Sequence, residues 1–139
     1  MVGFYGWSNS GKTTLIERVL RELDARGKRA AVIKQSRMEG SLNTPGKDTW
    51  RFARAGARPV VFHTQEESVV FLPGTLTLDE LVEMITAVDK PDIILVEGAR
   101  DERVPKIRIG EIDKRPNTTM TYDDDFGALM DFILKGIPA

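Results

Sequence analysis

The chain has 139 residues, of which 41% are hydrophobic and 29% are charged, and these values are typical of one folded domain with a substantial core. No apolar run approaches the roughly 20 residues of a membrane span, and a net charge of −1 lacks the basic field that nucleic-acid binding needs. The absence of cysteine and the single histidine, His63, exclude disulfides and a thiolate metal site and favour a cytoplasmic location. Because the first predicted strand follows Met1 directly, we expect no signal peptide.

The most informative segment is Gly6-Trp7-Ser8-Asn9-Ser10-Gly11-Lys12-Thr13, which matches the phosphate-loop pattern G-x-x-x-x-G-K-[ST]. Residues 2–5 before it form a short apolar run typical of a buried strand. Apolar residues after it recur at helical spacing, beginning with Leu15, Ile16 and Val19. An ordinary turn before a helix is the alternative, but a turn needs neither the Lys-Thr pair nor the preceding strand.

The phosphate loop favours a polyphosphate, because its backbone N–H groups and those of the first helical turn converge on one point. Gly6 and Gly11 permit the close approach of the backbone, Lys12 can reach the β- and γ-phosphates, and the Thr13 hydroxyl can ligate Mg²⁺. The predicted nucleotide-binding residues of this segment are Gly6, Ser8, Asn9, Ser10, Gly11, Lys12, Thr13 and Thr14.

The next segments predict a parallel α/β unit. The first helix should end near Gly27, and the apolar run at residues 29–34 predicts a second strand. The right-handed crossover makes this strand parallel to the first, so Lys34 should lie at the edge that carries the phosphate loop. Residues 35–46 predict a long functional loop, and a short helix begins near Asp48.

The middle of the chain predicts either a β-hairpin or two successive strands, at residues 59–63 and 69–72. A capping box at Thr77 opens a helix to about Val88, and a last amphipathic helix covers residues 123–135. We therefore expect residues 1–139 to form a single P-loop nucleotide-binding domain. Its fold should be a mostly parallel twisted sheet with helices on both faces and a β-hairpin extension.

A further apolar run, predicted to be a buried strand, lies between two acids, Asp92 and Glu97. At a rise of ~3.3 Å per residue these acids are ~16 Å apart, so only one of them can lie at the edge that carries the phosphate loop. We assign that place to Glu97, which would hold Mg²⁺ through a water or orient the attacking water. Gly98 would let the backbone turn there. Asp48 is the other candidate for metal binding or catalysis, although helix N-terminal electrostatics would also explain it. Arg100 and Lys106 are interpreted as phosphate clamps or as solvated charges.

Three stretches together resemble the MobB family of molybdopterin-guanine dinucleotide biosynthesis adapter proteins. They are Gly6 to Thr14; Pro45-Gly46-Lys47-Asp48-Thr49 with Ala55-Gly56-Ala57; and Leu95-Val96-Glu97-Gly98 with Pro105-Lys106-Ile107. The resemblance implies a homodimeric P-loop protein that binds GTP with Mg²⁺ and hydrolyses it slowly. It also implies that this protein assists the guanylyltransferase that attaches GMP to the molybdenum cofactor, with molybdopterin as a further ligand. It gives Lys12 and Thr13 phosphate and magnesium roles, with Asp48 and Glu97 as acidic partners.

The sequence departs from the family pattern at one place, and other functions are possible for a phosphate-loop protein. Similar family members often carry histidines where this chain has Gln35, Ser36 and Arg37. A small-molecule kinase would need an arginine-bearing lid, a metal-delivery GTPase would need Cys or His ligands, and an adapter could lack chemistry altogether. No motif identifies the base, although Asp113 would suit guanine if it is more than a turn residue.

Overall fold

The computed structural model describes residues 1–137 and divides the chain into two compact units. The first comprises Met1–Ser36 and Leu78–Ala139, and the second comprises Arg37–Thr77. No helix in the described part of the chain is both long and apolar enough to cross a membrane.

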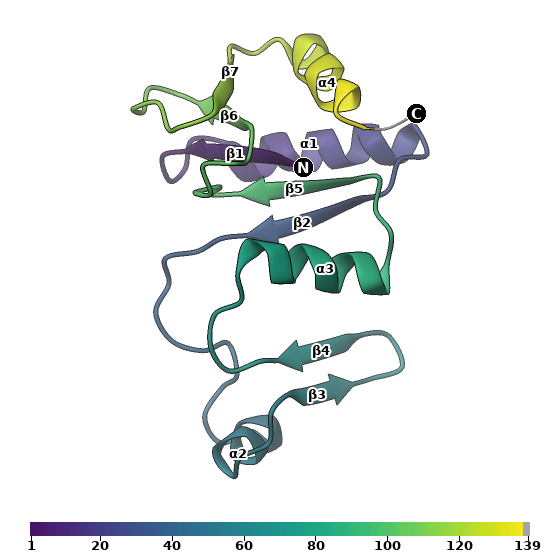
Figure 1. Cartoon of the computed structure of the whole chain (residues 1–139), viewed down its shortest axis with the longest axis vertical. Helices are drawn as coiled ribbons and strands as arrows, with labels where there is room; N and C mark the ends of the chain where they lie inside the picture. The colour runs from purple at the N-terminus through teal and green to yellow at the C-terminus, as the bar shows by residue number, and fades with distance from the viewer. Residues whose placement is uncertain (138–139) are drawn as a thin grey trace. The chain divides into compact units, whose positions relative to one another are not determined.

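The first unit is built on a five-stranded sheet in the order β2-β5-β1-β6-β7, in which every neighbouring pair is parallel (Figure 1). The strands are β1 (Val2–Gly6), β2 (Ala30–Lys34), β5 (Ile93–Glu97), β6 (Lys106–Ile109) and β7 (Thr118–Tyr122). The predicted parallel relation of the first two strands is confirmed, with β5 lying between them. The carboxyl ends of all five strands therefore meet at one edge of the sheet.

Helices cover both faces of this sheet, as expected for the predicted fold class. Helices α1 (Lys12–Ala25) and α4 (Phe126–Lys135) pack on one face, and α3 (Leu78–Val88) packs on the other. Strand alternation explains this arrangement, because Ile93 and Leu95 of β5 join the core with α1 and α4, while Ile94 and Val96 join the core with α3.

The second unit contains one helix and one hairpin. These elements are α2 (Asp48–Arg54), β3 (Val60–His63) and β4 (Ser68–Phe71), and the two strands pair antiparallel. Of the two arrangements that the sequence left open, the hairpin is therefore the observed one. The Thr64 hydroxyl accepts hydrogen bonds from the backbone N–H groups of Glu66 and Glu67, which closes the turn. The predicted absence of helix and strand from residues 35–46 is confirmed.

The sequence analysis did not predict β7. Its Thr-Thr-Met-Thr-Tyr sequence is polar, and its residues alternate between half-buried and exposed along this edge strand. A short strand of this kind lacks the continuous apolar run that identified the buried strands, although its threonines and tyrosine have high β-propensity. The last helix begins at Phe126, later than predicted, because Asp125 caps it by accepting a hydrogen bond from the backbone N–H of Ala128.

The interpretation of Lys106 as a phosphate clamp or a solvated charge is wrong. Its side chain is fully buried, and its Nζ donates hydrogen bonds to the backbone carbonyls of Asp101, Val104 and Pro116. Burial lowers the pKa of the Lys106 ammonium. This lysine therefore connects the segment that follows β5 to the segment that precedes β7.

Candidate functional site

The loop between β1 and α1 has the backbone geometry of an anion site. Asn9 and Gly11 both adopt the left-handed conformation, with φ of 60° and 83°, and Ser10 between them donates its N–H to the carbonyl of Trp7. Gly11 is the N-cap of α1 and offers no capping side chain. The amide groups of the loop and of the first helical turn are thus arranged as a nest that favours negative charge.

Gly6 is required by close packing at the start of this loop. A Cβ at Gly6 would lie 2.5 Å from the carbonyl oxygen of Ile109 and 2.8 Å from the Ser10 Oγ. The Ser10 Oγ is itself buried and has no hydrogen-bond partner among residues 1–137. An orphaned hydroxyl beneath a nest of amides fits a site whose remaining partners come from a bound phosphate.

Apart from Ser10, the polar side chains of the loop and of the first helical turn are at least partly exposed. Lys12 bends back so that its Nζ donates a hydrogen bond to the carbonyl of Trp7, across the loop. Thr13, in the first turn of α1, is exposed, and its hydroxyl makes no hydrogen bond within the described part of the chain. Ser8, Asn9 and Thr14 are also exposed. Lys12 and Thr13 are therefore available for a phosphate and its metal ion.

Glu97 lies at the carboxyl end of β5, as predicted, where it is in register with Phe4 of β1 and Lys34 of β2. Lys34 is exposed at the same edge. Asp92 lies at the opposite end of the strand, where its carboxylate accepts a hydrogen bond of 2.7 Å from the backbone N–H of Arg29. The choice of Glu97 over Asp92 as the acid at the phosphate-loop edge is confirmed, while its metal or catalytic role stays a prediction.

The turn after Glu97 depends on Gly98 and Gln35. Gly98 has φ of 76°, and a Cβ there would lie 2.6 Å from the carbonyl oxygen of Gln35. The Gln35 side-chain oxygen accepts a hydrogen bond from the backbone N–H of Arg100. Gln35 therefore holds this turn, and sequence reasoning missed this role. The Arg100 side chain is exposed, so its predicted contact with phosphate stays a prediction.

Asp48 belongs to the second unit, where it begins α2. Its carboxylate is exposed, and one of its oxygens lies 3.9 Å from an Arg51 nitrogen. This placement agrees with the alternative of helix N-terminal electrostatics and leaves its metal role as a prediction.

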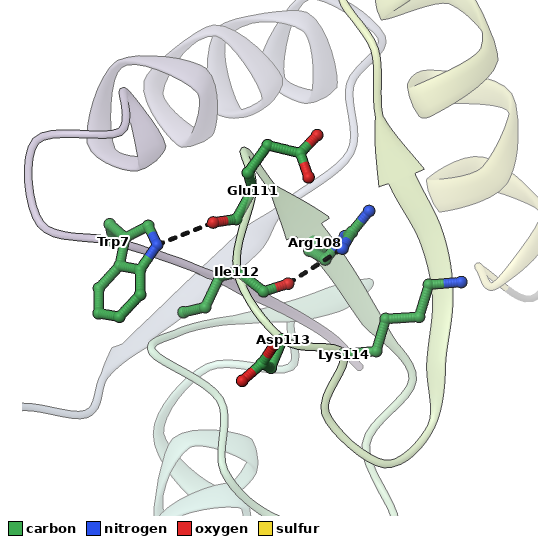
Figure 2. Close-up of a pocket in the computed structure, with 6 residues that line it drawn as sticks. All are labelled: Trp7, Arg108, Glu111, Ile112, Asp113 and Lys114. Atoms are coloured by element: carbon green, nitrogen blue, oxygen red, sulfur yellow. Dashed lines mark hydrogen bonds between the residues drawn. The ribbon is translucent and has the colours of Figure 1, made fainter.

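A pocket of about 310 Å³ adjoins the phosphate loop, and Figure 2 shows the residues that line it. Trp7 forms one side, and its indole N–H donates a 2.9 Å hydrogen bond to the carbonyl of Glu111. The other lining residues are Arg108, Glu111, Ile112, Asp113 and Lys114. The sequence analysis singled out Asp113 in this segment but did not predict the pocket, because nothing in the pattern indicates that Trp7 bonds to Glu111.

The donor set also limits how a metal ion could be held. No group of three or more His, Cys, Asp or Glu side chains in residues 1–137 is arranged to bind a metal. A divalent cation would therefore take phosphate oxygens of a bound nucleotide among its ligands, as Mg²⁺ does at phosphate loops. On the protein, the Thr13 hydroxyl and the Glu97 carboxylate fit this purpose.

Comparisons with known proteins give the same family over most of the chain. Residues 1–131 match the family described as molybdopterin guanine dinucleotide synthesis protein B, MobB. The molybdopterin-guanine dinucleotide biosynthesis adapter protein of Haemophilus influenzae is 38% identical over 77% of this chain and 61% of its own length. The Escherichia coli protein of the same description is 34% identical over 77% of this chain and 63% of its own length.

The fold agrees with a solved structure. The crystal structure of Bacillus subtilis MobB superposes with a TM-score of 0.73 at 23% identity, over 99% of this chain and 98% of that one. The chain spans less than two thirds of the length of the two curated relatives named above. Because the family model matches nearly the whole chain and the fold agrees with it, the chain belongs to the molybdopterin guanine dinucleotide synthesis protein B family, MobB.

Proposed function

We propose that this protein is a cytoplasmic GTP-binding adapter that assists the formation of molybdopterin guanine dinucleotide and hydrolyses GTP slowly with Mg²⁺. The observation that carries the proposal is the nest formed by Asn9, Ser10 and Gly11, with Lys12 across it and Glu97 at the same sheet edge. The family relatives described as adapter proteins support the biosynthetic role.

Different residues would bind the phosphates and the Mg²⁺ ion. The loop amides and Lys12 would hold the β- and γ-phosphates, with Lys34 and Arg100 as further cations at the same edge. Thr13 and Glu97 would hold Mg²⁺, and Asp48 is a further metal-binding candidate. When bound, Mg²⁺ neutralises charge on the phosphate oxygens. Glu97 would also orient the attacking water, directly or as a partner of a metal-bound water.

Slow turnover is expected because Arg100, the arginine proposed for phosphate binding, is exposed and its side chain is not held in place by any of residues 1–137, while two other arginines are engaged elsewhere. Arg108 donates to the carbonyl of Ile112 and to the Thr121 hydroxyl, and Arg115 donates to the carbonyl of Ala99 while stacking 4.8 Å from the centroid of the Tyr5 ring. These guanidinium groups are held in place by structural contacts. An arginine finger is worth about 10³ to 10⁵ in rate, so a site without one should turn over on the order of minutes or longer.

The binding proposal is tested by titration with GTP, ATP and GDP, with and without Mg²⁺, using tryptophan fluorescence. The chain has two tryptophans, so Trp50→Phe leaves Trp7, which lies inside the loop, as the reporter. We expect saturable binding, with GTP competing better than ATP. Lys12→Ala should weaken it strongly, whereas Lys135→Ala, an exposed lysine of α4, should not. An unchanged titration for Lys12→Ala would refute the phosphate-loop assignment, and equal affinity for GTP and ATP would refute the guanine preference.

The hydrolysis proposal is tested by single-turnover assays. Glu97→Gln should still bind GTP, because Lys12 and the loop amides remain, but should lose most of the turnover. Glu83→Gln, at an exposed position of α3, is the matched control. If Glu97→Gln hydrolyses GTP at the parent rate while Asp48→Asn is inactive, the acidic role moves to Asp48. Several turnovers per second by the isolated protein would contradict the proposal that the site lacks a catalytic arginine.

The partner of the adapter is proposed to be the guanylyltransferase of molybdenum cofactor biosynthesis, with molybdopterin as a further ligand and a homodimer as the working state. Turnover measured with and without that enzyme separates a weak GTPase from an adapter without chemistry. A rate that rises with the partner would support the first, and no hydrolysis under either condition would support the second.

A further inference from the structure

The pocket beside Trp7 contains a carboxylate that has no partner in the part of the chain that the structure describes. Of its charged lining residues, Arg108 is already engaged by the Ile112 carbonyl and the Thr121 hydroxyl. The Asp113 carboxylate is exposed and forms no hydrogen bond or ion pair with any of residues 1–137. In Figure 2 it lies on the same side of the 111–114 segment as the Trp7 ring, whereas the Lys114 side chain extends away from that ring.

Trp7 gives this pocket a fixed aromatic wall. Its indole is 63% exposed, yet its N–H is held by the carbonyl of Glu111, so the ring is both accessible and oriented. Its position next to Gly6 places it in the phosphate loop itself, and Gly6 is in register with Ile109 at the end of β6. A flat aromatic ligand group stacked on this indole would therefore lie beside the loop that is proposed to hold the phosphates.

The size and chemistry of the pocket fit a nucleobase. A volume of about 310 Å³ lies at the lower end of the range for small-molecule sites, and on the side of Trp7 the pocket combines one aromatic wall with the Asp113 carboxylate. The Glu111 carboxylate also has no hydrogen bond or ion pair with residues 1–137, but in Figure 2 it extends away from the Trp7 ring. Guanine presents N1–H and N2–H₂ side by side, so one carboxylate can accept both hydrogen bonds. Adenine presents the N1 acceptor beside a single amino group, which would set a lone pair against the carboxylate.

We propose that this pocket receives the base of the nucleotide, with Trp7 stacking on the ring and Asp113 selecting guanine through its N1–H and N2–H₂ groups. This inference rests on the nucleotide binding proposed above and names the residue that gives that site its base specificity.

The test uses Asp113→Asn in the full chain that carries Trp50→Phe, with Trp7 fluorescence as the readout for GTP, ATP and xanthosine triphosphate. The Asn oxygen can accept a hydrogen bond from guanine N1–H, but the Asn NH₂ group then faces the guanine N2–H₂ group, donor against donor. The affinity for GTP should therefore fall by about 10- to 100-fold, while the affinity for ATP does not fall. Xanthosine triphosphate has a carbonyl at C2, which the amide can donate to, so its affinity should rise. Asp131→Asn, an exposed position on α4, is the matched control and should change none of these affinities.

Inorganic triphosphate separates this inference from the function on which it rests. It should bind the parent and Asp113→Asn equally, because it contacts only the phosphate loop. If it binds but Asp113→Asn leaves the ratio of GTP to ATP affinity unchanged, the base assignment is wrong and the phosphate site stands. If neither triphosphate nor GTP binds the parent protein, the proposed function and this inference both fail.

Discussion

Lys106 shows how a single residue can carry a role opposite to the one its charge suggests. In sequence it stands among charged residues and invites a phosphate-binding interpretation. In the structure its ammonium is buried against the carbonyls of Asp101, Val104 and Pro116. A buried ammonium persists only where hydrogen bonds compensate its desolvation. Lys106 is therefore a structural residue that fixes the loops around the sheet edge.

Replacing Lys106 by Met should destabilise the protein by about 3 kcal/mol, because the apolar side chain leaves buried carbonyls without their donor. Urea unfolding measures this, with Lys114→Met as an exposed control that should change stability by no more than about 0.5 kcal/mol. A loss of less than about 1 kcal/mol for Lys106→Met would contradict the structural role.

The pH dependence gives an independent check on the same residue. Burial lowers the pKa of Lys106 in the folded state below its ordinary value of 10.5. At a pH between the folded-state pKa and the unfolded-state pKa, Lys106 is more protonated in the unfolded chain than in the folded protein. The free energy of unfolding therefore gains a contribution that rises with pH in this range. The Met variant should lack this rise when its unfolding is followed over the same alkaline range.

At the scale of elements, the helices and strands that could be predicted from the sequence are those with a continuous or periodic apolar pattern. The buried strands β1, β2 and β5 and the helices α1 and α3 have strong periodicity, and all were predicted to within about two residues. The hairpin was predicted as one of two options, because periodicity cannot decide how two strands pair. Strand β7 was missed, since an edge strand with alternating exposure needs no apolar run.

In the candidate site, the features that follow from neighbouring residues could be predicted, and the contacts between distant segments could not. Sequence placed the phosphate loop and Glu97, because both follow directly from strands whose carboxyl ends must share an edge. The hydrogen bond that the backbone N–H of Arg100 donates to the Gln35 side chain, and the one that the Trp7 indole donates to the Glu111 carbonyl, could not be predicted. Both join segments far apart in the chain, and no spacing rule connects them.

At the scale of the whole molecule, the second unit, residues 37–77, is too small to bury a core by itself. No residue of α2 is buried, and in the hairpin strands only Val60 is. Large apolar side chains remain exposed there, among them Phe52, Val61, Phe62 and Val70. On the hairpin these side chains occupy both faces, with the pair Val61 and Val70 on one face and Phe62 on the other. Exposed apolar side chains on a two-stranded hairpin are typical of an interaction surface.

We predict that a second copy of the chain covers this hairpin, as the family resemblance implies, and that the protein is a homodimer. Val61 and Val70 are direct cross-strand partners, 56% and 48% exposed, so Val61→Lys combined with Val70→Lys would place two charges in the contact. Sedimentation equilibrium at micromolar concentration should give twice the 15.5 kDa chain mass for the parent and the single chain mass for this variant. Val88→Lys, 86% exposed at the end of α3, should stay dimeric. A parent that sediments as one chain with and without nucleotide would contradict the dimer. A lysine variant that stays dimeric would move the interface away from the hairpin.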